Sequence, residues 1–327
     1  MSEPPTRLPT FQPVSLTTDQ RIIVLKAIQH FLTAYLPPFI ILLGLLGNVL
    51  SWILMSQPQY RNSTNCLYMR FLALSDSLYI LTRVLQRWLL VIIPEILTAP
   101  GVQGIFCRQY LFMANFCITS SSYLLVVMSI NRLIALMFPL KAKLWCTMFR
   151  ARLSLLCLYG VALIFNLSNF WRIRHPKYAT WLCPYHFSND VLYQTIHSIV
   201  NIYIQACLLF LVNVAIIITV KRTGRKRAKM FGAKLEKGDK EQELSITQTL
   251  LIVSFTYLFC LVPQRAQAVI FTTWRPVYDI AFWKAIDRFF LDLCTILENF
   301  NFSLNSYIYI LVSKRFRKEL REIIRGT

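Results

Sequence analysis

The sequence predicts an all-α membrane protein built as a bundle of seven transmembrane helices. Its 327 residues are 56% hydrophobic and only 15% charged, which is too apolar for a water-soluble domain. A transmembrane helix needs about 20 mostly apolar residues to cross the hydrocarbon core of a bilayer. Seven such stretches follow one another with short connections, at 28–55, 65–92, 106–138, 150–171, 190–220, 246–272 and 285–311.

The distribution of lysine and arginine indicates the orientation of the chain. Basic residues are concentrated in 139–153, in the linker-like stretch 221–243 and after residue 312, and they are sparse in the loops that alternate with these. Because short cytoplasmic loops carry the excess of basic residues, the N-terminus should lie outside the cell. We expect an extracellular segment over 1–27, the bundle over 28–311 and a cytoplasmic end over 312–327.

The net charge of +20 follows from this topology. Basic loops on the cytoplasmic side face anionic lipid, so the charge indicates a membrane partner. It does not indicate nucleic-acid binding, because basicity alone cannot outweigh seven apolar spans. The first twenty residues lack the pattern of a cleavable signal peptide, and the first span should therefore direct the chain to the membrane.

The residues do not indicate an enzyme. The four histidines are scattered, no nucleophile lies at a spacing that would pair it with a base, and no glycine-rich phosphate loop is present. The nine cysteines show no metal-ligand spacing. Cys107 and Cys183 fall where outer loops meet the spans, and an oxidising exterior would let them pair; two separate thiols are the alternative.

Ionisable residues inside the spans predict a polar interior. Asp76, Arg83 and Arg87 stand at i, i+7 and i+11 of the second span, so a regular helix places them on one face. Such groups line a bundle interior or a watery cavity, because exposure to lipid is costly. This polar seam fits either ion passage or a hydrogen-bond network that can switch. It continues in the seventh span with Glu298, Asn301, Asn305 and Tyr309.

The third and sixth spans each contain one further informative residue. The helix between Cys107 and Arg132 is long enough to cross the bilayer, so Arg132 should border the cytoplasm when Cys107 lies at the outer mouth. Pro263 removes a backbone hydrogen bond from the sixth span and should kink it. The kink is either a hinge or a packing irregularity.

At these positions the sequence resembles the rhodopsin-like (class A) G-protein-coupled receptors. The matching motifs are GLLGNVL and LALSD in the first two spans, NRLIALMFPLKAK at the end of the third, and FCLVP and NSYIY in the sixth and seventh. Cys107 and Cys183 are similar to the family's disulfide pair, and SKRFRKEL resembles its short amphipathic helix after the bundle. The stretch PLKAKLWCT is most like invertebrate neuropeptide receptors, including those for FMRFamide-like and myosuppressin-like peptides.

Several departures from the family fall on its switch residues. Leu261 stands where the family has a tryptophan, Ser306 where it has a proline, and Tyr159 where the fourth span has a tryptophan. The fifth span contains no proline. The resemblance nevertheless implies roles in activation and G-protein coupling for Asn131, Arg132, Glu243, Leu261, Pro263, Asn305 and Tyr309.

The restraint on Arg132 should also differ from that in the family. The family holds this arginine through a neighbouring acid and through an acid on the sixth helix. Asn131 replaces the first acid, whereas Glu243 matches the second. We predict that Arg132 and Glu243 alone restrain the resting state, which would make basal activity higher than usual.

The family's sodium pocket has a counterpart in this sequence. Asp76, Ser121, Asn301 and Asn305 match it, and a hard cation favours such oxygen ligands. The resemblance therefore implies a weak allosteric sodium site. A network of amide and carboxylate hydrogen bonds around water is the alternative. No cofactor is required.

The outer cavity is expected to bind a peptide. Ala114 stands where amine receptors place an aspartate, and Asn299 where opsins place the retinal lysine, which argues against monoamines and light. Arginines can bind carboxylates or carbonyls through paired hydrogen bonds, and Glu298 could receive a cation. Alternatively, Glu298 and Arg265 only satisfy each other. The residues assigned to ligand binding are Arg83, Arg87, Asn115, Arg265, Asp292 and Glu298.

The leading hypothesis is a cell-surface receptor in the plasma membrane. It would bind a peptide outside and open its cytoplasmic side to a heterotrimeric G protein by shifting a pre-existing equilibrium. A seven-span transporter or proton pump that uses Asp76 and Glu298 is the rival hypothesis. The absence of inverted repeats in the sequence argues against it, and Arg132 has no role in it. A third hypothesis is a divergent receptor with high basal or lost signalling.

Overall fold

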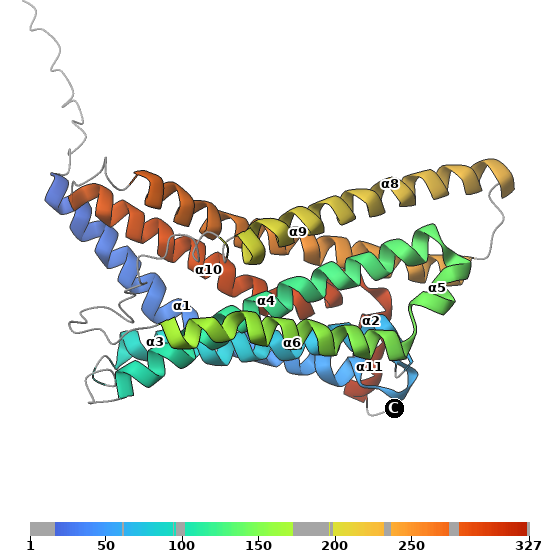
Figure 1. Ribbon diagram of the computed structural model, residues 1–327, viewed down its shortest axis with the longest axis horizontal. Coiled ribbons are helices and arrows are strands. Elements are labelled where there is room, and N and C mark those ends of the chain that lie inside the picture. The colour runs from blue at the N-terminus through green and yellow to red at the C-terminus, as the bar shows by residue number, and fades with distance from the viewer. Residues whose placement is uncertain are drawn as a thin grey trace, which may run out of the picture.

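The computed structural model is a bundle of long helices that run side by side (Figure 1). It describes residues 17–60, 62–93, 95, 102–172, 196, 199–231, 237–274 and 281–325, and within them there is no strand. The described α-helices are α1 (Thr18–Met55), α2 (Thr64–Tyr79), α3 (Leu85–Ile92), α4 (Val102–Met137), α5 (Pro139–Trp145), α6 (Met148–Arg172), α8 (Gln205–Phe231), α9 (Lys237–Trp274), α10 (Ala281–Val312) and α11 (Lys314–Arg325). The π segments η2 (Ile80–Val84) and η4 (Ile199–Ile204) and the 3-10 turn η1 (Pro58–Tyr60) lie between them.

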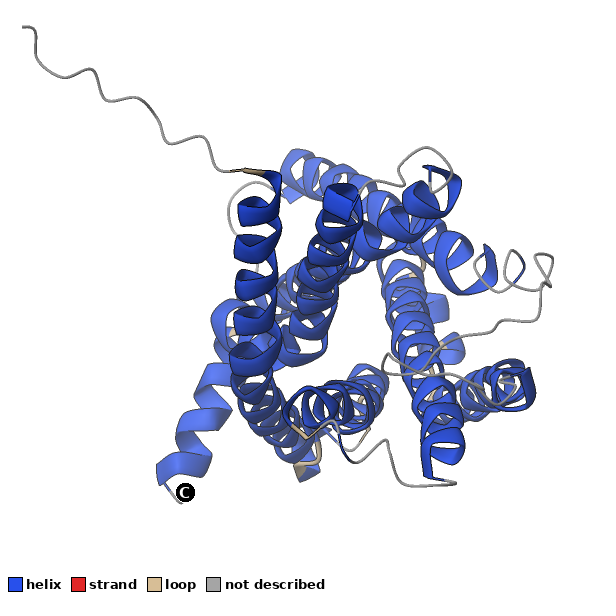
Figure 2. Ribbon diagram, turned by 90° about the vertical axis from the view of Figure 1, so that its left-hand side faces the viewer, coloured by secondary structure: helices blue, strands red, loops and turns tan. Residues whose placement is uncertain are grey.

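The helices enclose a common interior in the end-on view (Figure 2), and α4 is the helix with the most buried apolar window. It contacts α2, α6, α8 and α9, whereas α1 contacts α2, α3 and α10. In its most apolar window, 72% of the α4 residues are buried inside the protein, compared with 17% in α6. The centre of the bundle therefore holds α4, and α6 presents most of its surface outward.

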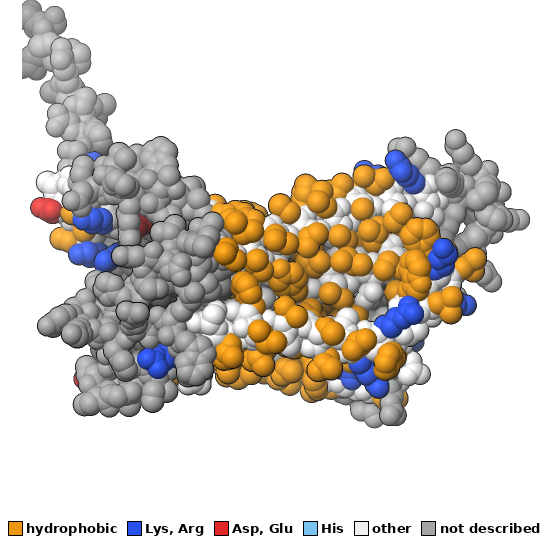
Figure 3. Space-filling model, in the orientation of Figure 1, with side chains coloured by type: hydrophobic (Ala, Val, Ile, Leu, Met, Phe, Trp, Pro, Cys, Tyr) orange, Lys and Arg blue, Asp and Glu red, His pale blue; other side chains and the backbone are white. Residues whose placement is uncertain are grey.

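The outward surfaces suit a lipid environment. Hydrophobic side chains cover the middle of the face in Figure 3, the described Lys and Arg side chains gather toward its ends, and many of the exposed residues are Leu, Ile and Phe. Within the described residues, five helices are long and apolar enough to cross a membrane by themselves. The two remaining predicted spans correspond to α2–η2–α3, which a π segment divides, and to α10, which carries charges along its length. The predicted all-α seven-helix architecture is confirmed.

The bundle has an Asp292 end and an Arg132 end. The Asp292 end includes the start of α1 and the end of α3, at the left of Figure 1. The Arg132 end includes α5 and α11, at the right. α11 buries Phe316 and Glu319 and exposes Lys318, so the helix after the bundle is amphipathic as predicted.

Several helices are longer than the hydropathy pattern indicates. α1 begins at Thr18 rather than at residue 28, because Thr17 forms a capping box with Gln20 and starts the helix within the polar segment. α8 continues to Phe231 and α9 begins at Lys237. Most of the linker predicted at 221–243 is therefore helical, since lysine, arginine and glutamate favour helix as well as charge.

Two π segments interrupt the regular helices. η2 lies between α2 and α3, yet Asp76, Arg83 and Arg87 all contact α10, so the three side chains face the interior as their i, i+7, i+11 spacing predicts. In η4 the carbonyl of Val200 accepts a hydrogen bond from the Tyr123 hydroxyl at 3.0 Å. The fifth span thus departs from a regular helix although it contains no proline.

Helices α1 and α10 touch along a line of small residues. Asn48 donates to the backbone carbonyl of Phe302 at 3.1 Å, and the hydroxyls of Ser51 and Ser306 lie 2.7 Å apart. A side chain at Gly44 would come within 2.5 Å of both Ile80 and Ser303. Ser306 also donates to the carbonyl of Gly47. The serine at the family's proline position therefore joins α10 to α1.

A proline in α1 provides another contact between helices. Pro38 has no backbone N–H, so it leaves the carbonyl of Ala34 without its usual partner in the helix. The indole Nε1 of Trp88, on α3, donates to that carbonyl at 2.8 Å. This bond holds α3 against the part of α1 that carries Gln29.

Candidate functional site

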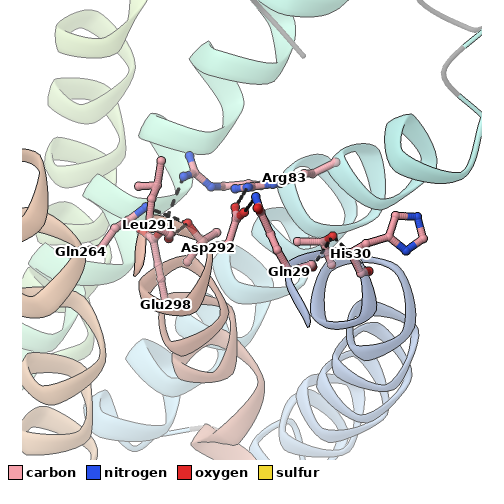
Figure 4. Close-up of polar contacts among 10 residues, drawn as sticks. Gln29, His30, Arg83, Gln264, Leu291, Asp292 and Glu298 are labelled. Carbon is pink, nitrogen blue, oxygen red and sulfur yellow. Dashed lines mark hydrogen bonds and ion pairs between the residues drawn. The ribbon is translucent and has the colours of Figure 1, made fainter. Parts of the chain in front are cut away.

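Two ion pairs connect the second and seventh spans toward the Asp292 end. Arg83, in η2, places Nη2 at 3.4 Å from Oε2 of Glu298 on α10. Arg87, one turn further along α3, pairs with Asp292, which also accepts a hydrogen bond from Gln29 of α1. Figure 4 shows Arg83, Asp292, Gln29 and Glu298 converging from these three elements. The structure therefore brings together four of the six residues predicted to bind ligand.

Because the carboxylates are buried, these ion pairs strongly affect the stability of the bundle. Glu298 is completely buried and the side chain of Asp292 is 9% exposed, whereas those of Arg83 and Arg87 are 15% and 27% exposed. A buried carboxylate needs a nearby positive charge, because the interior solvates it poorly. Both arginine side chains are partly exposed to solvent, so a group of an incoming ligand can compete with the carboxylates for them.

The other two residues of the predicted ligand site are not part of this cluster as described. Asn115 is half-buried and donates to the carbonyl of Leu111 in its own helix at 3.0 Å. The side chain of Arg265 lies outside the described residues, so the predicted pairing of Glu298 with Arg265 has no described geometry. Glu298 instead contacts Arg83.

Three glutamines and a threonine extend the site beyond the predicted residues. Gln29 contacts Asp292, Gln264 of α9 donates to Thr295 at 3.4 Å, and Gln267 donates to Asp287 at 2.8 Å. The pattern of ionisable residues in the sequence does not include these neutral amides. Glutamine inside an apolar helix is itself a signal, because its amide must find partners away from water.

Asp76 forms a separate buried cluster nearer the middle of the bundle. Its Oδ1 accepts from Ser121 at 2.7 Å and its Oδ2 accepts from Asn305 at 2.6 Å, and Asp76 has no exposed surface. Asn301 is 2% exposed, and its Oδ1 has no hydrogen-bond partner among the described residues. Three of the four predicted sodium ligands are joined directly, and the fourth supplies a buried oxygen that suits a hard cation.

Arg132 links α4 to α9 at its own end of the bundle. It is 6% exposed, and its Nε donates to the hydroxyl of Thr247 at 2.7 Å. The side chain of Glu243, one turn earlier in α9, lies outside the described residues. The Cys146 thiol lies 3.8 Å from Oδ1 of Asn131, and burial raises the pKa of this thiol, so it remains protonated and able to donate.

The structure also describes the other positions that the family resemblance singled out. The Tyr159 hydroxyl lies 2.6 Å from that of Ser75 and donates to the carbonyl of Phe71 at 3.1 Å. Leu261 is buried, and Pro263 lies inside the continuous helix α9. Tyr309 is 2% exposed and packs against Phe316. Cys183 and the side chain of Cys107 lie outside what the structure describes, so the predicted pair has no described geometry.

Comparison with known proteins identifies the family. The model for "7 transmembrane receptor (rhodopsin family)" matches residues 47–309, which is most of the chain. This chain belongs to that family. The resemblance seen in its motifs is thereby confirmed, and the protein is a membrane receptor by family rather than an enzyme.

Individual relatives in this receptor family are distant. The chain is 28% identical over 305 residues to an FMRFamide receptor of Drosophila melanogaster, with 84% of the chain and 50% of that receptor covered. It is 23% identical over 329 residues to the alpha-1A adrenergic receptor of Bos taurus, with 88% and 66% covered. The chain thus spans half to two thirds of the length of these relatives.

Proposed function

We propose that this rhodopsin-family receptor binds a peptide at the Asp292 end and activates a heterotrimeric G protein at the Arg132 end. The observation that carries the proposal is that α9 and α10 connect the ion pairs at the Asp292 end with the other end of the bundle, where Arg132 contacts Thr247. α10 carries Asp292 and Glu298 at one end and joins α11 at the other. α9 carries Gln264 toward one end and Thr247, the partner of Arg132, toward the other.

A peptide suits the Asp292 end by its chemistry. The site offers two arginines, two carboxylates and several amides, which complement the amides, termini and charged side chains of a peptide. One relative is named an FMRFamide receptor, which supports a short peptide as the ligand class. The other is named an adrenergic receptor, but Ala114 provides no counter-ion for an amine and is fully buried.

Ligand binding would act by redistributing the ion pairs. A peptide carboxylate or carbonyl that engages Arg83 or Arg87 competes with Glu298 or Asp292 for them. Such competition changes the position of α10 relative to η2 and α3. The ligand shifts the equilibrium only if it binds one arrangement better than the other. Weakening of the α4–α9 contact at Arg132 would then open a surface for the G protein.

The orientation in the membrane is part of the proposal. The basic residues of α5 and α11 lie at the Arg132 end, which supports a cytoplasmic location for that end and an extracellular N-terminus. We place the receptor in the plasma membrane, with Cys107 and Cys183 forming a disulfide on the extracellular side. Cleavage of this bond by an impermeant reductant should lower ligand affinity in intact cells, and unchanged affinity would argue for two separate thiols.

Sodium binding at Asp76 is the proposed allosteric element. Asp76, Ser121 and Asn305 are already joined, and the Asn301 amide would supply a further oxygen. A bound cation would place positive charge beside a fully buried carboxylate and stabilise the closed arrangement. The hydrogen-bond network around water requires no ion and would show no preference for sodium over potassium.

A screen of neuropeptides in cells that express the chain tests the main proposal. G-protein activation should follow at least one peptide, and Arg132→Ala should abolish the response while surface expression and peptide binding remain. If no peptide acts and vesicles that contain the protein take up protons, the receptor proposal is wrong and the pump is favoured.

A further inference from the structure

A cavity of about 130 Å³ lies at the Arg132 end, between α1, η1, α2, α9, α10 and α11. Buried apolar side chains form its floor, among them Met55, Met69 and Phe316. Its rim is polar and includes exposed Gln59 and half-buried Asn65 and Ser313. An apolar cavity of about 150 Å³ is known to hold a benzene-sized molecule. The volume here therefore suits a small ring.

Two reactive groups face this cavity. Cys66 lies in the first turn of α2, where its backbone N–H is capped by Ser63, and its thiol lines the wall. Tyr309 lines the same cavity from α10, is 2% exposed, and its hydroxyl has no hydrogen-bond partner among the described residues. A buried donor without an acceptor is costly. A molecule with a carbonyl oxygen in the cavity would satisfy it.

We propose that the cavity binds small, uncharged α,β-unsaturated carbonyl compounds and that Cys66 is covalently modified by them. Tyr309 donates a hydrogen bond to the carbonyl oxygen, which withdraws electrons from the conjugated alkene. The Cys66 sulfur forms a bond to the β-carbon, the C=C π bond breaks, and the thiol proton ends on the α-carbon. The addition needs no oxidant or reductant.

The surroundings of Cys66 favour this addition. Thiols react as thiolates, and the N-terminal turn of a helix stabilises negative charge on the sulfur as the bond forms. The apolar floor excludes charged electrophiles, because moving a charge out of water is costly. Size, neutrality and a conjugated carbonyl together define the class of compound.

The test compares two maleimides of equal length on the purified receptor in phosphatidylcholine nanodiscs. N-propylmaleimide is uncharged and 3-maleimidopropionate carries a carboxylate. Peptide mass spectrometry gives the rate of adduct formation at each cysteine. For Cys66, we expect the rate with N-propylmaleimide to saturate as its concentration rises, and the rate with 3-maleimidopropionate to be at least tenfold lower. A linear dependence on concentration, or equal rates for the two probes, overturns the proposal.

Two variants and an internal reference identify the residues responsible. Tyr309→Phe should slow the modification of Cys66 at least fivefold, and Asn65→Trp, which narrows the rim, should slow it at least tenfold. Cys146, which lies outside the cavity at the same end, should react equally in all three proteins and so report that they are folded. Unchanged Cys66 rates in both variants contradict the site. Neither a peptide ligand nor a G protein is needed.

Discussion

Arg83, in a π segment of the second span, lies 3.4 Å from the fully buried carboxylate of Glu298 on α10. The neighbouring pair of Arg87 and Asp292 repeats the connection toward the end of the bundle. These pairs hold the second and seventh spans together where a ligand is proposed to bind. The same charged residues therefore stabilise the resting receptor and are the groups that a ligand must engage.

Glu298→Leu should destabilise the protein strongly. Removing one partner of a buried ion pair costs about 3–5 kcal/mol, and the 15% exposure of Arg83 places the effect toward the lower limit. Arg83→Met combined with Glu298→Leu should recover part of the loss, because Arg83 is then not left in the bundle without Glu298. The midpoint of thermal denaturation in detergent measures both. Lys318→Ala, which breaks an exposed pair with Glu322, serves as the control and should change stability by less than about 1 kcal/mol. Equal effects of Lys318→Ala and Glu298→Leu would contradict the buried pair.

Gly44→Ala should destabilise the contact between α1 and α10. Its Cβ would lie 2.5 Å from Cδ1 of Ile80 and from Oγ of Ser303, and 3.0 Å from Cβ of Ser303, so these side chains or the helices that carry them have to shift. Overpacking of this kind costs roughly 1–3 kcal/mol. Gly160→Ala is the matched control, because no atom lies within 4 Å of the new Cβ and alanine favours the helix. A thermal midpoint for Gly44→Ala at or above that of Gly160→Ala would refute the close approach.

The arrangement of the spans could be predicted from the sequence more completely than the contacts within them. Hydropathy placed the seven spans because crossing a bilayer demands apolar length. The same reasoning placed Asp76 and Glu298 inside the bundle, since lipid cannot solvate them. Both residues are fully buried.

The pairing of charges could not be predicted in this way. Regular helical spacing cannot foresee the π segment that contains Arg83, because it depends on packing against other spans. The spacing placed Arg83 and Glu298 toward the interior, but it does not say which charges pair, because that depends on how the spans pack together. Thr17 and Gln20 did contain a capping signal, which hydropathy alone overlooked.

Thr247→Val should raise basal G-protein activity. The substitution keeps the shape of the side chain but removes the hydroxyl that accepts from Arg132 at 2.7 Å. One hydrogen bond to a charged group is worth about 1.5–3 kcal/mol, which is enough to increase a minor open population by about tenfold or more. Thr247→Ser should behave as the native protein. Nucleotide exchange without ligand measures the effect, and Glu243→Ala should act in the same direction. Unchanged exchange in both Thr247→Val and Glu243→Ala would show that this contact does not restrain the closed state.

Sodium should stabilise the native receptor more than potassium does. The cation would sit beside Asp76 with oxygens from Ser121 and Asn301, while Nδ2 of Asn305 donates to the carboxylate. Thermal denaturation in 150 mM sodium or potassium chloride, at the same ionic strength, separates ion binding from general screening. Asp76→Asn removes the charge and should abolish the difference between the two salts. Identical midpoints of the native protein in the two salts would favour a hydrogen-bond network around water.

The most direct test of the account is GTP exchange by purified heterotrimeric G protein in the presence of the receptor in nanodiscs. A peptide that activates the native receptor should accelerate exchange. Asp292→Asn should shift the peptide concentration required, and Arg132→Ala should abolish acceleration without affecting peptide binding. If the two ends are coupled, Asp292→Asn should affect the response to the peptide and Arg132→Ala should affect only the activation of the G protein. Acceleration that survives Arg132→Ala, or peptide binding that is lost in Arg132→Ala but unaltered in Asp292→Asn, would contradict it.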